Sequence, residues 1–81
     1  MTVEEIKQIS DKYNELNKLI HEYCENLNIT DFSYIIYWRF LTTKYSNEIK
    51  VEYRNTIGYN GSLSITFEEL EKYYENKERI N

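Results

Sequence analysis

The sequence predicts an α+β fold with the element order α-β-β-β-α, in which two helices pack on one face of a three-stranded antiparallel meander. The phrase Thr-x-Glu-Glu occurs at Thr2–Glu5 and again at Thr66–Glu69, and each copy has the pattern of a helix start with a capping box. A helical repeat follows the first copy, and residues of alternating character fill the interval between the two. Because the 81 residues contain no linker-like segment, we expect a single domain spanning residues 1–81.

The first helix is predicted by apolar residues spaced alternately three and four positions apart. A helix from Val3 to Leu27 would be about 37 Å long, whereas a compact domain of this size is about 30 Å across. One end of the helix is therefore expected to project, or to continue its apolar stripe against another subunit. The stripe consists of Ile6, Ile9, Tyr13, Leu16, Ile20, Tyr23 and Leu27.

The middle of the chain is predicted to form three strands. From Phe32 to Leu41 the pattern has a period of two, which is typical of a strand with two distinct faces. Alternation around Val51 and around Leu63 predicts the second and third strands, with turns at Ser46-Asn47 and at Gly58–Gly61. The second helix follows Thr66. On the first strand we expect Phe32, Tyr34, Ile36, Trp38 and Phe40 to face the helices, and Ile35, Tyr37, Arg39 and Leu41 to face outward.

Composition restricts the cellular setting. The single cysteine, Cys24, excludes an intrachain disulfide and fits a reducing compartment. The N-terminus is acidic and amphipathic, unlike a signal peptide, and no apolar run approaches the roughly 20 residues that span a bilayer. We therefore expect a cytoplasmic protein without a membrane partner, in the host cytoplasm if the gene belongs to a phage.

The sequence contains no convincing catalytic or metal-binding pattern. His21 and Cys24 lie three residues apart on one helix, but no further histidine or cysteine exists to complete a zinc site. The paired carboxylates Glu4-Glu5 and Glu68-Glu69 lie in first helical turns, where capping and the helix dipole account for them. We therefore expect no enzymatic activity, no metal and no cofactor.

An acidic stripe on the first helix is a candidate binding surface. Its residues step by seven, four and seven positions and fall within about 40° of one another, opposite the apolar stripe. A row of carboxylates can imitate a nucleic-acid backbone and occupy a basic groove. A solvated helix face, with Lys7 and Lys18 alongside, is the simpler explanation. The acidic stripe consists of Glu4, Asp11, Glu15 and Glu22.

The outer sheet face is a second candidate surface, made by Ile35, Tyr37, Arg39 and Leu41 beside Lys50 and Arg54. Tyrosine and arginine are enriched at interfaces, and an aromatic, basic sheet can also stack on nucleic-acid bases. Acidic residues exceed basic ones by four in residues 1–31 and by two in residues 67–81, while residues 32–66 have two excess positive charges. Direct nucleic-acid binding is disfavoured because both helices are acidic.

The order α-β-β-β-α resembles that of the double-stranded RNA-binding domain at the level of topology. That family holds phosphates with lysines at the start of its second helix, whereas the matching segment here, Thr66–Glu71, is acidic. RNA binding is therefore not inferred from the resemblance. Small acidic phage-encoded inhibitors, including anti-CRISPR proteins, have a similar general character but share no motif with this chain.

These observations favour a small acidic protein-interaction module that inhibits or modulates a larger partner by occupying its surface. A nucleic-acid-binding enzyme is the partner that the acidic stripe fits, and phage or mobile-element counter-defence is the setting. The first alternative is a self-associating structural or regulatory module, such as a homodimer. The second is a weak single-stranded nucleic-acid binder that uses the sheet face.

Overall fold

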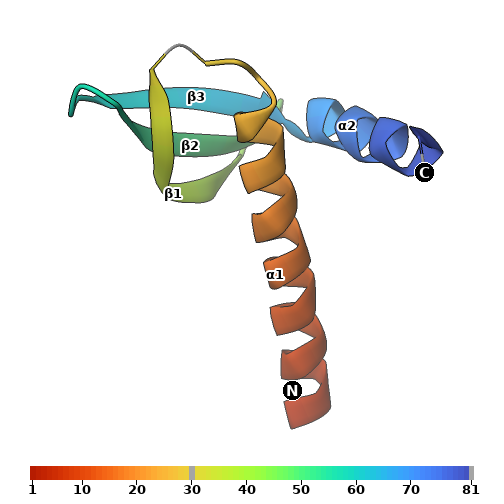
Figure 1. The fold of residues 1–81 in the computed structure, drawn as a ribbon. Helices are drawn as coiled ribbons and strands as arrows, with labels where there is room; N and C mark the ends of the chain where they lie inside the picture. Colours follow the sequence, from red (N-terminus) through yellow and green to blue (C-terminus); the bar gives the residue numbers. More distant parts are fainter. Residues whose placement is uncertain (30, 81) are drawn as a thin grey trace.

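The computed structural model describes residues 1–29 and 31–80, with side chains as far as residue 78, and confirms the α-β-β-β-α order (Figure 1). The two helices are α1 (Val3–Glu25) and α2 (Phe67–Ile80). The strands are β1 (Phe32–Thr42), β2 (Asn47–Asn55) and β3 (Asn60–Thr66). They form one antiparallel sheet in the order β1-β2-β3, as the meander requires.

Both ends of α1 are capped by side chains. The Thr2 hydroxyl accepts a hydrogen bond from the Glu5 backbone N–H, and the Glu5 carboxylate accepts one from the Thr2 N–H, each at 3.1 Å. At the other end, the Asn26 side-chain amide donates to the Glu22 carbonyl at 2.9 Å and to the Tyr73 hydroxyl at 2.8 Å. The helix ends two residues before the predicted Leu27 because Asn26 takes the capping position.

The second Thr-x-Glu-Glu phrase caps α2 and also ties it to α1. The Thr66 hydroxyl accepts from the Glu69 backbone N–H at 3.1 Å. The Glu69 carboxylate accepts from the Tyr23 hydroxyl of α1 at 3.2 Å. The phrase therefore begins both helices, as predicted, but at its second occurrence the Glu69 carboxylate connects the two helices through Tyr23 instead of closing the predicted capping box.

The core is a single cluster on the helix-facing side of the sheet. Ile20 and Cys24 come from α1 and Leu70 from α2, and all three are at most 6 % exposed. Both helices therefore pack on the same face of the sheet, as predicted. The strand residues of the cluster are Ile49, Val51 and Ile65.

Two β-bulges in β1 change which of its side chains face the helices, so part of that prediction is wrong. The pairing with β2 shifts between Phe32 and Tyr34 and again between Ile35 and Tyr37. Each shift inserts one extra residue, which reverses the faces of the residues that follow. Ile35, predicted to face outward, is therefore opposite Tyr53 and packs against the core.

The same bulges move two residues away from their predicted core positions. Tyr34 is opposite Arg54 and is 54 % exposed, and Ile36, at the second bulge, is 41 % exposed. The predicted facing holds beyond the second bulge. There Trp38 and Phe40 are opposite the core residues Val51 and Ile49, which leaves Tyr37, Arg39 and Leu41 on the outer face.

The N-terminal half of α1 projects from the rest of the molecule. Every residue from 1 to 15 is exposed, and the helix extends well beyond the sheet to its N-terminus (Figure 1). The principal extents of the molecule are 45 × 30 × 27 Å. The excess length predicted for the first helix is therefore confirmed as a projecting end. Neither described helix is long and apolar enough to cross a membrane.

We predict that Ile20 and Ile9, on the same helix, respond very differently to the same change. Ile20→Val should lower the free energy of unfolding by about 1 kcal/mol, because it removes a methylene from a fully buried site. Ile9→Val is the matched control, since Ile9 is 56 % exposed and both changes carry the same helix-propensity cost. Urea denaturation at low protein concentration measures both. Equal losses would show that α1 is not anchored through Ile20.

Candidate protein interface

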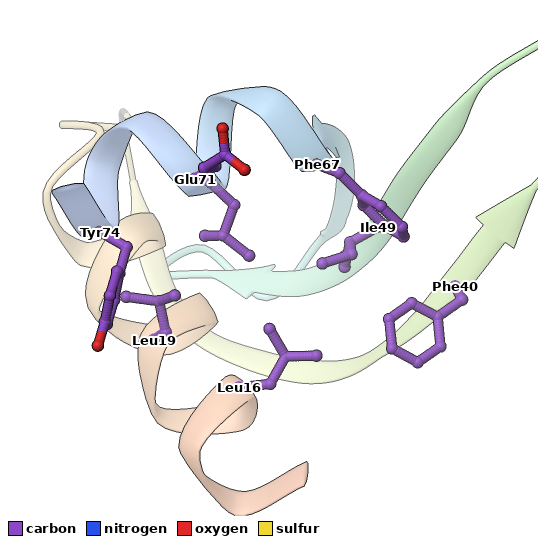
Figure 2. Close-up of a pocket in the computed structure, with 8 residues that line it drawn as sticks. Leu16, Leu19, Phe40, Ile49, Phe67, Glu71 and Tyr74 are labelled. Atoms are coloured by element: carbon purple, nitrogen blue, oxygen red, sulfur yellow. The ribbon is translucent and has the colours of Figure 1, made fainter. Parts of the chain in front are cut away.

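An apolar concavity lies between α1, α2 and the end of the sheet (Figure 2). Its volume is about 300 Å³, and Glu71 is the only charged residue that lines it. We call it the apolar hollow. Its other lining residues are Leu16, Leu19, Phe40, Ile49, Phe67, Leu70 and Tyr74.

A row of four aromatic rings runs beside the apolar hollow and joins three elements. Tyr13 of α1 stacks on Trp38 of β1 with ring centroids 5.3 Å apart. Phe40 lies edge-on to Trp38 at 5.4 Å and to Phe67 of α2 at 6.1 Å. The Trp38 indole N–H donates to the Asn17 side-chain oxygen at 2.8 Å, which fixes α1 against β1. The row is therefore held in place, and Tyr13 and Phe40 within it are 53 % and 51 % exposed.

Sequence reasoning missed this surface, although it named several of its residues. Phe40 was predicted to face the helices, and Phe67 and Tyr74, seven residues apart, lie on one side of α2. The structure leaves them 51 %, 36 % and 51 % exposed because α1 and α2 diverge from the end of the sheet (Figure 1). The excess length of the first helix was a signal that coverage would be incomplete. Nothing in the spacing of apolar residues predicted that α2 would diverge from α1.

The acidic stripe is interrupted by lysines in the structure. Glu15 forms an exposed ion pair with Lys12 at 3.5 Å, and Glu22 is bound by Lys77 of α2. The Lys77 hydrogen bond is the main cause of a lowered pKa at Glu22 and of a raised pKa at Lys77. Glu4 and Asp11 remain on the exposed projecting half of α1. The four carboxylates therefore do not form an uninterrupted negative row.

The outer sheet face carries both signs of charge. The exposed Arg39 is opposite Lys50, while Glu48 and Glu52 alternate with Lys50 along β2. A hydrogen bond to Glu52 raises the pKa of Tyr37. The Arg54 guanidinium donates a hydrogen bond to the Gly58 carbonyl at 3.2 Å and so contacts the turn between β2 and β3. Leu41 is half-buried and Ile35 belongs to the core side, while the exposed Tyr34 lies opposite Arg54, so the composition of this face differs from the prediction.

His21 and Cys24 do not form a reactive pair in this fold. Cys24 is buried in the core at 1 % exposure, and burial raises the pKa of its thiol to about 11. His21 is half-buried and lines a small pocket against β1, beside Tyr13 and Asn17. Within residues 1–29 and 31–80, no group of three or more His, Cys, Asp and Glu side chains could hold a metal ion.

No protein-family model, no curated protein and no solved structure matches this chain. The apolar hollow and the adjoining aromatic row together form a candidate protein interface.

Burial should make the Cys24 thiol unreactive in the folded protein. We predict that a thiol reagent at pH 8 modifies native Cys24 at least about tenfold more slowly than the urea-unfolded chain, because access is blocked and the raised pKa keeps the thiol protonated. The native rate should keep rising with pH up to about 11, whereas the rate of the unfolded chain should level off at a lower pH. Absorbance or mass spectrometry follows the modification. A native rate equal to or above the unfolded rate would contradict the core assignment of Cys24.

Proposed function

We propose that this protein is an interaction module that binds a larger partner protein through the apolar hollow and inhibits or modulates that partner by occupying its surface. The observation that carries the proposal is a concave apolar site that the fold leaves open. Leu16 and Leu19 of α1 and Phe67 of α2 converge on that site (Figure 2).

The dimensions of the apolar hollow suit an anchoring side chain from a protein. A volume of about 300 Å³ is at the lower end of the range for ligand pockets. Burial of one large apolar side chain contributes about 1.5–3 kcal/mol, and interface energetics are commonly concentrated in a few such anchors. Tyr74 and Phe40 stand half-exposed beside the hollow and can close around the anchor.

Charge indicates what should flank the anchor. Glu71 lines the apolar hollow, and α2 carries five acidic residues against three basic ones. The whole chain has a net charge of −4. A partner segment with an apolar anchor between basic residues therefore complements this surface.

Nucleic-acid-binding enzymes present basic surfaces, so they are a class of partner that can supply basic residues around the apolar anchor. Phage or mobile-element counter-defence is the setting in which a small acidic inhibitor of such an enzyme fits. The geometry favours the apolar hollow over the acidic stripe as the contact surface, since lysines neutralise Glu15 and Glu22. It also disfavours single-stranded nucleic-acid binding through the sheet face, where Glu48 and Glu52 alternate with the basic residues.

The proposal is tested with two short synthetic peptides, each with a central tryptophan, flanked by lysines in one and by glutamates in the other. We expect the lysine-flanked peptide to bind more tightly and to shift the amide resonances of Leu19, Phe67 and Tyr74 in NMR titrations. Glu71→Lys should narrow the difference in affinity between the lysine-flanked and the glutamate-flanked peptide, because it reverses the charge at the edge of the apolar hollow.

Two tyrosines provide a matched pair for the same titration. Tyr74→Ala should weaken binding by about tenfold, since it removes one wall of the apolar hollow. Tyr59→Ala should have no effect, because Tyr59 is 70 % exposed beside the β2–β3 turn, away from the hollow. The proposal fails if neither peptide shifts the lining residues, or if both tyrosine variants lose affinity equally.

A further inference from the structure

The projecting half of α1 carries an apolar face that the fold leaves uncovered. Ile6 and Ile9 are 52 % and 56 % exposed, and Val3 is 73 % exposed. An isolated helix of about a dozen residues is only marginally stable in water. The capping box at Thr2 stabilises the start of this segment. The apolar face of the segment, however, is not covered by any other part of the described chain.

We propose that a second copy of this chain covers this face, through antiparallel pairing of the two projecting helices. The face that pairs consists of Val3, Ile6 and Ile9, and we call it the free stripe. It differs from the apolar hollow of the proposed function, so the two proposals stand or fall separately.

The structure restricts how two copies can align. The free stripe ends at Tyr13, since Trp38 stacks on the Tyr13 ring at 5.3 Å and the helix beyond lies against the sheet. A partner helix therefore has to lie over Ile6 and Ile9. An antiparallel alignment that places Ile6 opposite the partner's Ile9, and Ile9 opposite the partner's Ile6, satisfies this with a two-fold axis near Gln8.

Antiparallel pairing also keeps the globular parts apart. It places the two sheets at opposite ends of the helix pair, whereas parallel pairing places them side by side where α1 meets the sheet. It sets the two helix dipoles in opposite directions, which is the favourable arrangement. Parallel pairing would instead bring Glu4 and Glu5 of both copies to the same end.

The flanking charges complement one another in this alignment. Glu5 and Lys12 are seven residues apart and therefore lie on the same side of the free stripe, within about 20° of each other. The alignment that places Ile6 opposite the partner's Ile9 sets Glu5 beside the partner's Lys12, and the two-fold axis repeats the pair. At the opposite edge of the free stripe, Val3 lies opposite the partner's Ser10, so no like charges are opposed.

The groups needed for these ion pairs are accessible. The Lys12 side chain is 81 % exposed, and its ion pair with Glu15 spans one exposed helical turn, an arrangement that contributes little to stability. One Glu5 carboxylate oxygen takes part in the capping box, and the second can accept from the partner's lysine. The contact covers about three helical turns, less than a standard interface. A weak, reversible dimer is therefore expected.

The experiment uses the full chain and a charge exchange. Wild type should change with concentration from 10.0 kDa to twice that mass in sedimentation equilibrium. Glu5→Lys and Lys12→Glu should each dimerise at least about tenfold more weakly, because each homodimer then opposes like charges. An equal mixture of the two variants should recover association, since both ion pairs re-form only in the mixed dimer. If Glu5→Lys weakened association only by removing the capping box, mixing with Lys12→Glu would not restore it. Recovery of association in the mixture therefore indicates the antiparallel ion pairs.

The apolar contact has its own matched pair of variants. Ile9→Glu should abolish dimerisation, because it places a charge at the centre of the contact. Ile57→Glu should have no effect, since Ile57 is 68 % exposed in the β2–β3 turn. The inference is overturned if wild type stays monomeric at every concentration, if Ile9→Glu still dimerises, or if the mixed variants fail to associate.

Discussion

The packing of Ile20 and Cys24 against the sheet is the contact on which the rest of the structure depends. These two residues are the only fully buried side chains of α1 among the described residues, and both belong to its C-terminal half. They meet Val51 and Ile65 of the sheet and Leu70 of α2 in one small cluster. Because α1 is anchored so close to one end, its other half extends beyond the sheet. The projecting helix follows directly from the position of this core.

Polar contacts between the helices determine how far they diverge. Tyr23 donates to Glu69, Asn26 donates to Tyr73, and Lys77 binds Glu22, so α2 is held across the C-terminal end of α1. Further along α1, Leu16 and Leu19 face the open side of that crossing. The apolar hollow is therefore a consequence of helix geometry, and the Glu22–Lys77 contact lines a neighbouring pocket that shares Leu19 and Tyr74 with the hollow.

The element order, both helix starts and most core residues could be predicted, because capping phrases and periodicity are local signals. From the excess length of the first helix we expected one end to project or to pair with another subunit, and the structure shows a projecting end. The bulges in β1 could not be foreseen, since the alternation from Phe32 to Leu41 is unbroken in sequence. For that reason Ile35 was assigned to the wrong face. The exposure of Phe40 and Tyr74 depends on the angle between α1 and α2, which arises from side-chain pairs far apart in the sequence, such as Asn26 and Tyr73.

Tyr13 divides α1 into an anchored half and an exposed half, and we propose that a second copy covers the exposed half. Hydrogen exchange along α1, measured at low and at high protein concentration, tests this division most directly. At low concentration, amides around Ile20 and Cys24 should be protected while those between Glu5 and Lys12 exchange rapidly. At high concentration, protection should spread into residues 5–12. Uniform protection along α1 at every concentration would contradict the account, and so would rapid exchange of residues 5–12 that concentration does not change.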